Sequence, residues 1–261
     1  GVAIYRPGNK SSLKLTVHSE FPERDYLSLK EDLSNALNAC FKVCRNNTHA
    51  VIEFPSEKLD QLRNKISEIR PNIRIMSIGE TIEIYKSVGS PEKVARRFDL
   101  SAMIGSHGIG HTRMATESAI TTDGAHPYST GSDQCLVHNG SLSNHNNLRR
   151  KLQREGIQIE SENDTEVGAA YLTSKMARGA MLDEALKQAL DELDGFYTFV
   201  VGTKDGFGVL RDPIACKPAV LAETTKYVAF GSEYRALANL PNISDAVVWE
   251  PEPATVYFWS H

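Results

Sequence analysis

The stretch that decides the interpretation of this sequence is Ile109-Gly110-His111-Thr112-Arg113-Met114-Ala115-Thr116. Two further motifs follow it, Val137-His138-Asn139-Gly140-Ser141-Leu142-Ser143-Asn144 and Glu162-Asn163-Asp164-Thr165-Glu166. Together they supply a cation in Arg113, a polar segment in Asn139-Gly140 and a carboxylate in Asp164. A guanidinium binds a carboxylate through two parallel hydrogen bonds, and a carboxylate binds an ammonium group. The three motifs therefore predict a site for a free amino acid.

Each motif also has a structural explanation. Arg113 could be an ordinary salt-bridge partner, Asn-Gly is the commonest two-residue hairpin turn, and Asp is a common helix N-cap. In the functional interpretation, the Asn139 amide and the Gly140 backbone N–H hold a developing oxyanion, which a residue without a Cβ permits. Thr116 could add a hydroxyl to the carboxylate site of Arg113, and Asp164 would bind an ammonium group.

Composition excludes several classes of function. The chain has 261 residues, of which 41% are apolar, so it can bury a sizeable core. Its net charge is −4 and its basic residues are spread along the chain, which argues against nucleic-acid binding. No apolar run approaches the roughly 18 residues of a membrane span, and no signal peptide is visible. We therefore predict a cytoplasmic protein that binds neither nucleic acid nor membrane.

The four cysteines are Cys40, Cys44, Cys135 and Cys216, and their spacing is not that of a secreted disulfide framework. Cys40 and Cys44 stand four apart in a helical pattern, and we interpret them as small core residues rather than as half a metal site. His107 and His111 are also four apart, but the glycines between them argue against a helix. No phosphate loop or dinucleotide motif is present, so neither metal nor cofactor is predicted.

Residues 1–10 are predicted to contain a strand. The pattern of strands and helices predicted for residues 11–100 indicates a small α+β insert. Leu13, Leu15 and Val17 alternate with polar residues, as in a half-buried strand. Helical spacing recurs over residues 29–40 and 59–69. Two strands are expected around Gly79, and Ser90-Pro91 predicts the start of a helix. From residue 101 onward, helices after Asn144 and Asp164 are followed by several strands beginning near Phe196, which favours a layered α/β sandwich.

The motifs of residues 101–261 resemble the class II glutamine amidotransferase domain, a branch of the N-terminal nucleophile (Ntn) hydrolases. The matching segments are Gly110-His111-Thr112-Arg113, Ala115-Thr116, Gly124-Ala125-His126-Pro127, His138-Asn139-Gly140, Asn163-Asp164-Thr165-Glu166, Asp194-Gly195-Phe196, Arg211-Asp212-Pro213 and Gly231-Ser232-Glu233. Met114 stands where many members have an aromatic residue. The chain looks most like the stand-alone glutaminase subunits of glutamate-synthase-like and N-methylglutamate-synthase-like complexes.

This resemblance implies an α+β fold, a four-layer αββα sandwich of the Ntn-hydrolase type. It also implies hydrolysis of L-glutamine to glutamate and ammonia, and transfer of the ammonia to a partner synthase subunit within a homo- or hetero-oligomer. Arg113 and Thr116 would hold the α-carboxylate of glutamine, and Asp164 would hold its α-ammonium group. Asn139 and Gly140 would form the oxyanion hole.

The family nucleophile is a cysteine at the mature N-terminus, whose free α-amino group serves as the base. Residue 1 is Gly, so we expect the nucleophilic cysteine to lie upstream of Gly1, and we predict that the chain as given is inactive alone. Two alternatives stay open: a non-catalytic glutamine-binding or assembly subunit of a synthase complex, and an Ntn hydrolase of another amide. Cys135 lies in an apolar run without a neighbouring base, which predicts a buried strand residue rather than a substitute nucleophile.

Overall fold

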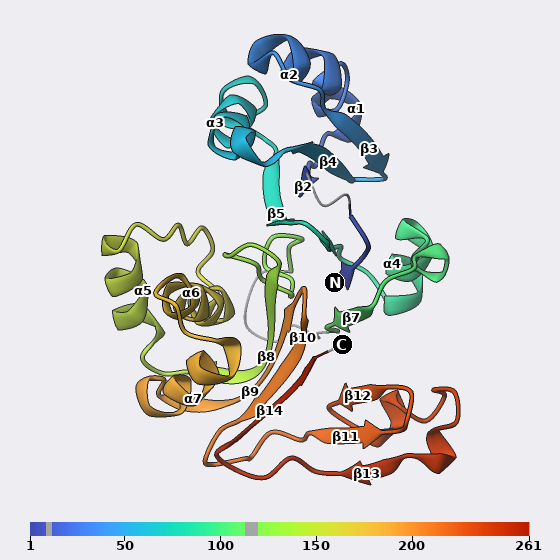
Figure 1. The fold of residues 1–261 in the computed structure, drawn as a ribbon, viewed down its shortest axis with the longest axis vertical. Helices are drawn as coiled ribbons and strands as arrows, with labels where there is room; N and C mark the ends of the chain where they lie inside the picture. The colour runs from blue at the N-terminus through green and yellow to red at the C-terminus, as the bar shows by residue number, and fades with distance from the viewer. Residues whose placement is uncertain (9–11, 113–119, 261) are drawn as a thin grey trace. The chain divides into compact units, whose positions relative to one another are not determined.

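The computed structural model describes residues 1–8, 12–112 and 120–260. Arg113 and Thr116, predicted to bind the substrate carboxylate, lie outside the described residues. The chain divides into two compact units, the first Gly1–Val137 with Gly202–Lys204, the second His138–Val201 with Asp205–His261 (Figure 1). Within the described ranges, no helix is both long enough and apolar enough to cross a membrane.

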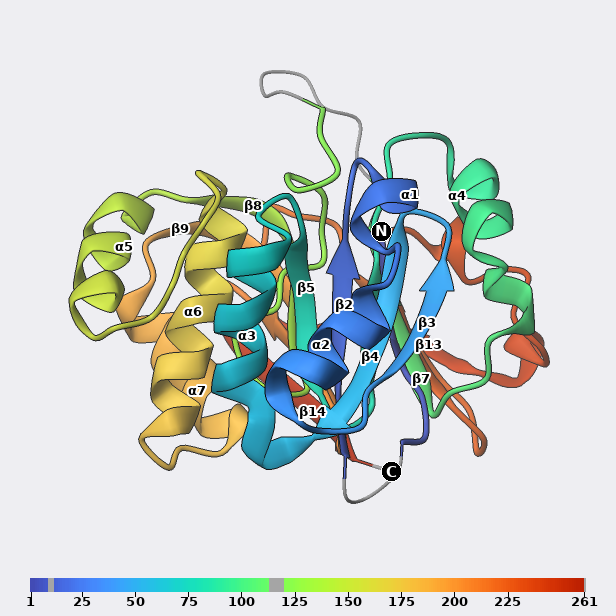
Figure 2. The same ribbon diagram turned by 90° about the horizontal axis from the view of Figure 1, so that it is seen from above.

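Residues 12–79 of the first unit form a four-stranded antiparallel sheet with helices on one face (Figure 2). The chain order is β2 (Ser12–His18), α1 (Pro22–Asp25), α2 (Leu29–Leu37), β3 (Lys42–Asn46), β4 (His49–Pro55), a 3₁₀ turn (Ser56–Lys58), α3 (Leu59–Ile69) and β5 (Arg74–Gly79). The strands lie in the order β3-β4-β2-β5. Apart from the short α1, this is the β-α-β-β-α-β arrangement of ferredoxin-like domains.

The alternation of side chains explains why the helices cover only one face of this sheet. Leu15 of β2 and Ile52 of β4 pack with Leu33 of α2 and Leu62 of α3 in one buried cluster. Successive residues of a strand point to opposite faces, so Lys14, Lys42 and Glu53 lie on the face that the helices leave open. The predicted α+β character of this segment is therefore observed, and the domain boundaries at residues 10 and 100 remain a prediction.

The interpretation of Cys40 and Cys44 as core residues of one helix was wrong. Helix α2 ends at Leu37, where Asn38 takes a left-handed conformation with φ of 46°, so the chain leaves the helix before Cys40. Cys44 lies on β3, and both thiols are exposed. Among the described residues, no group of three or more His, Cys, Asp or Glu side chains could hold a metal ion.

A second sheet of the first unit consists of β6 (Ile82–Tyr85), β1 (Val2–Tyr5) and β7 (His107–Gly110), in that order and antiparallel. Helix α4 (Pro91–Phe98) and a 3₁₀ turn (Leu100–Ala102) follow β6, and Val94 and Phe98 of α4 pack on Tyr85. The carboxylate of Asp133 accepts hydrogen bonds from the backbone N–H groups of Glu80, Thr81 and Ile82. It thereby fixes the turn between β5 and β6.

The second unit combines two sheets with three helices. One sheet has the order β14-β10-β9-β8, and the other has the order β12-β11-β13. The elements are β8 (Gln134–Leu142), α5 (His145–Arg154), α6 (Asp164–Ala177), α7 (Leu182–Glu192), β9 (Gly195–Thr203), β10 (Gly206–Arg211), β11 (Val220–Glu223), β12 (Val228–Gly231), β13 (Val247–Trp249) and β14 (Thr255–Ser260), with 3₁₀ turns at Tyr234–Ala236 and Ile243–Asp245. The predicted mixed α+β class is confirmed.

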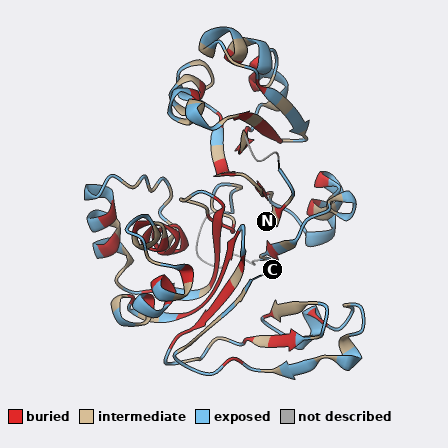
Figure 3. Ribbon diagram, viewed as in Figure 1, coloured by how far each residue is buried: buried red, intermediate tan, exposed pale blue. Residues whose placement is uncertain are grey.

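Helix α6 is the most enclosed helix of this unit. Every residue from Thr165 to Leu172 is buried, and Figure 3 shows this helix in the colour of buried residues. The helix lies against both α5 and α7. Small residues at Gly168, Ala169 and Ala170 let neighbouring elements approach the helix closely.

Candidate functional site

Asn139 and Gly140 lie within strand β8, so the explanation of this pair as a hairpin turn was wrong. Gly140 has a φ of +140°, which residues with a Cβ rarely adopt. A Cβ at this position would overlap the carbonyl oxygen of Phe196 and lie 2.7 Å from the Cα of Tyr197. Glycine is therefore required here by the close approach of β9. Gly140 is exposed and Asn139 is half-buried, so a ligand can reach both.

A second glycine makes the same contact from the other strand. Gly195, the first residue of β9, has a φ of +141°. A Cβ there would overlap the carbonyl oxygen of Ser141 and lie 3.1 Å from the Cα of Leu142. The two family motifs that contain Gly140 and Gly195 therefore meet in space, although they lie far apart in the sequence.

Asp164 is the first residue of α6, and the side chain that caps this helix belongs to Asn163. The Asn163 Oδ1 accepts the backbone N–H of Thr165 at 2.9 Å. The Asp164 side chain instead reaches β8, where its Oδ2 accepts the backbone N–H of Leu142 at 2.9 Å. The explanation of Asp164 as a simple N-cap was wrong. Its carboxylate is fixed to the strand two residues beyond Gly140.

His138 supports this carboxylate from the same strand. Its Nδ1 lies 3.6 Å from the Asp164 Oδ1 and 3.1 Å from the Thr165 Oγ1. Burial alone would raise the pKa of Asp164, but His138 and the Leu142 N–H outweigh it and lower the pKa to about 2. The carboxylate is therefore ionised at neutral pH, and it lies at a helix N-terminus, where the dipole also favours negative charge.

The segment before α6 is held by groups that the sequence analysis did not identify. Glu166 accepts the backbone N–H groups of Glu160 at 2.9 Å and Ser161 at 2.6 Å. Arg149 of α5 donates to the carbonyl oxygen of Ser161 at 2.6 Å. These bonds fix the approach to Asn163, and thus the position of Asp164. Only the place of Glu166 within the same short motif could have indicated its role.

The segment Arg211-Asp212-Pro213 has a structural role. Arg211 is buried and donates to the backbone carbonyl oxygens of Pro251, Ala215 and Lys217. The Asp212 carboxylate accepts the backbone N–H groups of Ile214 and Ala215, each at 3.1 Å. This motif therefore closes a turn and joins it to the segment before β14.

Cys135 is a buried residue of β8, as the sequence predicted. The Tyr5 hydroxyl donates to its sulfur at 3.5 Å. Burial raises the pKa of the thiol to about 11, so the thiol stays protonated at neutral pH. The histidines of the first unit pack mainly on rings, with His111 on His126 at 4.2 Å and His107 on Tyr5 at 4.1 Å between ring centroids.

Comparison with known proteins identifies the family of this chain. A family described as a glutamine amidotransferase domain matches residues 111–239. The glutamine amidotransferase-like protein GlxB of Rhizobium meliloti is 63% identical over all 261 residues, and the match covers 86% of that relative. The chain belongs to the class II glutamine amidotransferase family.

Other relatives of the chain are more distant. A putative glutamine amidotransferase of Methanothermobacter thermautotrophicus is 34% identical over 205 residues, which cover 77% of this chain and 67% of the relative. The glutamine phosphoribosylpyrophosphate amidotransferase of B. subtilis, solved with ADP and GMP, matches with a TM-score of 0.52 and 21% identity. The match covers 95% of this chain and 47% of that one, and it confirms the Ntn-hydrolase type of fold.

Proposed function

We propose that this amidotransferase binds L-glutamine and is the glutaminase component that supplies ammonia to a partner synthase in the cytoplasm. The observation that carries the proposal is the ionised Asp164 carboxylate, which is fixed to the strand that holds Asn139 and Gly140. An ammonium group needs a charged carboxylate, and an oxyanion needs donors that are already in place. The described residues proposed for these two roles, Asp164, Asn139 and Gly140, all belong to the second unit.

In this proposal, Asp164 binds the α-ammonium group of glutamine, and Arg113 and Thr116 bind its α-carboxylate. Asn139 contributes its side-chain amide and Gly140 its backbone N–H to the oxyanion of the tetrahedral intermediate. Loss of one such donor typically costs about 3 kcal/mol of transition-state stabilisation. The roles of Arg113 and Thr116 are supported by their place in the family motif.

The reaction of this family needs a cysteine with a free α-amino group. None of the four cysteines of this sequence has one, because each lies within the chain. Cys135 is excluded further by its burial and its raised pKa. We therefore expect the 261 residues alone to bind glutamine without hydrolysing it, and we expect hydrolysis to need a cysteine outside them.

Calorimetric titration of L-glutamine into this chain tests the binding role. Asp164→Asn keeps an acceptor for the Leu142 N–H but removes the charge, so we expect affinity to fall about 10- to 100-fold. The control is Asp183→Asn, on an exposed carboxylate of α7 that pairs with Lys187. Equal affinity of the wild type and Asp164→Asn, or no binding by the wild type, would reject the proposal.

The catalytic role is tested in a protein that also carries the N-terminal cysteine. There, Arg113→Ala should lower kcat/KM for glutamine, because the α-carboxylate loses its guanidinium. An unchanged kcat/KM would show that the substrate assignment is wrong. Glutamine binding without ammonia release would instead support the non-catalytic alternative.

A further inference from the structure

The first unit contains a cavity of about 710 Å³ on the open face of the β3-β4-β2-β5 sheet. This volume lies within the range of small-molecule sites. Of the residues proposed to bind glutamine, the described ones, Asn139, Gly140 and Asp164, do not line it. Its lining consists of Arg6, Pro7, Gly8, Lys14, Lys42, Cys44, Arg45, Asn46, Val51, Glu53, Glu83, Tyr85 and Ile104.

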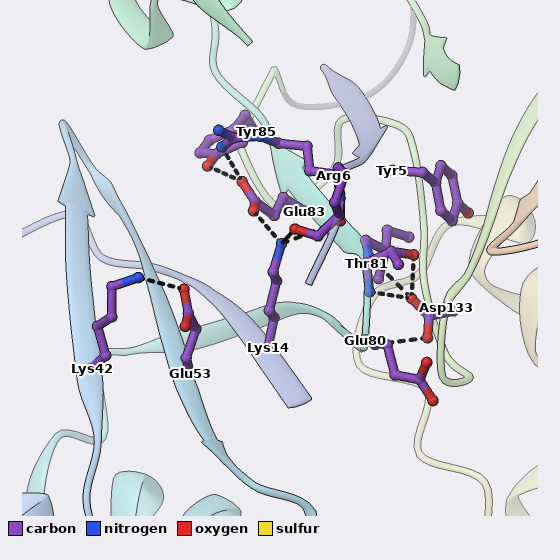
Figure 4. Close-up of polar contacts among 12 residues, drawn as sticks. Tyr5, Arg6, Lys14, Lys42, Glu53, Glu80, Thr81, Glu83, Tyr85 and Asp133 are labelled. Atoms are coloured by element: carbon purple, nitrogen blue, oxygen red, sulfur yellow. Dashed lines mark hydrogen bonds and ion pairs between the residues drawn. The ribbon is translucent and has the colours of Figure 1, made fainter. Parts of the chain in front are cut away.

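Three charged side chains form a row across the sheet wall of this cavity. Glu53 of β4 is the register partner of Lys42 on β3 and of Lys14 on β2. Figure 4 shows Lys42 beside Glu53, with Lys14 on the neighbouring strand. The Lys42 Nζ lies 2.9 Å from a carboxylate oxygen of Glu53. The side chain of Lys42 is 64% exposed, so this cation is available to a ligand.

The floor of the cavity is an ionic network around Glu83. The buried Lys14 donates to the Glu83 Oε1 at 2.9 Å and to the backbone oxygens of Arg6 and Pro7 at 3.4 Å (Figure 4). The Glu83 Oε2 accepts Arg6 at 2.9 Å and the Tyr85 hydroxyl at 2.8 Å. Burial would raise the pKa of Glu83, but these partners hold it below its usual value. Two cations thus face one carboxylate.

The lining as a whole carries an excess of positive charge. It contains four cationic side chains, Arg6, Lys14, Lys42 and Arg45, and two acidic ones, Glu53 and Glu83. Arg45 also pairs with Glu23, which does not line the cavity. Even with Glu23 included, one positive charge is left over. A low-dielectric concave wall concentrates such a field on a small anion.

The lining also restricts the shape of the ligand. Tyr85 is the one aromatic residue among the described lining residues, and its ring packs on Phe98 at 5.3 Å and His49 at 5.7 Å between centroids. Because Tyr85 is buried, its ring is not accessible for stacking with a nucleobase. A compact ligand without a large ring fits this wall better than a nucleotide.

We propose that this cavity binds a small organic dianion, either a dicarboxylate or a phosphate monoester without a nucleobase. Lys42 and the guanidinium of Arg6 supply the donors that hold it, since both cations bind carboxylate and phosphate oxygens. Glu53 opposes binding by its charge and sets the orientation of Lys42. Anion binding in this cavity does not require that the chain binds glutamine.

Cys44 provides a local reporter for this proposal. It is exposed and lines the cavity, whereas Cys40 and Cys216 are exposed and do not line it. The experiment measures iodoacetamide labelling of each cysteine by mass spectrometry, with inorganic phosphate or succinate added at matched ionic strength. Phosphate reports the phosphate-ester class and succinate the dicarboxylate class. We expect one of the two anions to slow Cys44 several-fold and to leave Cys40 and Cys216 unchanged.

Variants then locate the anion. Lys42→Ala should raise the half-protecting anion concentration about tenfold, because it removes a positive charge from the site. Glu53→Gln should lower this concentration, because it removes a negative charge that repels the anion. Lys187→Ala is the matched control, since Lys187 is 65% exposed and also pairs with one acid. The proposal is overturned if neither anion protects Cys44, if all three thiols slow equally, or if Lys42→Ala and Glu53→Gln behave as Lys187→Ala does. Thermal unfolding of each variant checks that it is folded.

Discussion

The backbone N–H of Leu142 donates to the Oδ2 of Asp164 at 2.9 Å, and this bond joins the end of β8 to the start of α6. The bond spans 22 residues of sequence and draws together two family motifs. Because the acceptor is a charged carboxylate, the contact belongs to the stronger class of hydrogen bond. It makes Asp164 a structural residue as well as a proposed ligand of the substrate.

The first prediction concerns the acid dependence of this contact. The pKa of Asp164 is lowered to about 2, below its unfolded value, so its contribution is present above the unfolded pKa and is lost as pH falls through about 2. Asp164→Asn should therefore lower the free energy of unfolding by about 2 kcal/mol at neutral pH. Urea unfolding at several pH values measures this difference. It should shrink below about pH 4, and a difference that stays constant into acid would contradict the assignment.

The second prediction concerns the close approach of β8 and β9. Gly140→Ala should lower the free energy of unfolding by about 3 kcal/mol, because the new Cβ meets the Phe196 carbonyl and the positive φ is strained. Gly156→Ala is the control, since Gly156 has a φ of +87° but nothing within 4 Å of an added Cβ. It should cost only about 1 kcal/mol. Equal losses in the two variants would show that the steric contact is relieved at no cost.

The third prediction concerns His49, which is fully buried on β4. Burial, together with His18 and Lys86 nearby, lowers its pKa from 6.5 to about 3. Its neutral form accepts the backbone N–H of Lys86 at 3.3 Å. Below about pH 6.5, His49 binds a proton in the unfolded chain but stays neutral in the folded chain. The free energy of unfolding therefore falls as pH falls.

A single such group contributes about 1.4 kcal/mol per pH unit inside this window. His49→Gln should be less stable than the wild type at neutral pH, yet its stability should fall less between about pH 6 and pH 4.5. Hydrogen exchange of the β4 amides measures both quantities in the unit concerned. Parallel pH profiles of the two proteins would remove His49 as the source of the acid sensitivity.

The fourth prediction compares a buried with an exposed ion pair on the same sheet face. The side chains of Lys14 and Glu83 are 7% and 5% exposed, so Lys14→Met leaves a buried carboxylate short of a partner. We expect a loss of about 3–5 kcal/mol for this variant and a smaller further loss on adding Glu83→Gln. The double-mutant cycle of Lys42→Ala and Glu53→Ala should give a coupling energy below about 1 kcal/mol. Similar coupling energies for the Lys14–Glu83 pair and the Lys42–Glu53 pair would show that burial does not strengthen the ion pair.

Much of the secondary structure could be predicted because it is encoded locally. Leu62, Ile66 and Ile69 recur at helical spacing, and α3 spans Leu59–Ile69. The alternation of Leu13, Leu15 and Val17 likewise matches β2. Ser90-Pro91 predicted the start of α4, although the Ser90 side chain makes no cap bond.

The rest depends on partners that lie far away in the sequence. Strand β3 is an edge strand whose composition is mostly polar, so its order comes from pairing with β4 rather than from its own apolar pattern. The Asp133 carboxylate accepts a backbone N–H of a turn about fifty residues earlier, and no local sequence pattern predicts such a contact. At the candidate site, residue type indicated Asp164 and Gly140, but not that Asn163 would take the cap and leave Asp164 free for Leu142.

The roles of Arg113 and Thr116 stay predictions from the family motif. For Gly140 and Asp164 the structure supplies neighbours, and for Asp164 it also indicates an ionised carboxylate. The roles of these two residues and of Asn139 stay proposals as well. The sequence could indicate these residues because their chemistry is distinctive. It could not indicate Arg149, whose guanidinium supports the site through the backbone oxygens of Ser161 and Asn163.

The crowded middle of α6 has a consequence for protein engineering. Ala170 lies about 9 Å along the helix axis from Asp164, since each residue advances the helix by about 1.5 Å. A bulkier side chain at this position would push against α5 or α7. It would tilt helix α6 and thereby displace the Asp164 carboxylate at the helix N-terminus. A saturation-mutagenesis screen scored on glutamine affinity should therefore reveal sensitive positions that bear no polar atom and never touch the amino acid. Libraries intended to alter substrate choice would do best to leave Gly168, Ala169 and Ala170 unchanged.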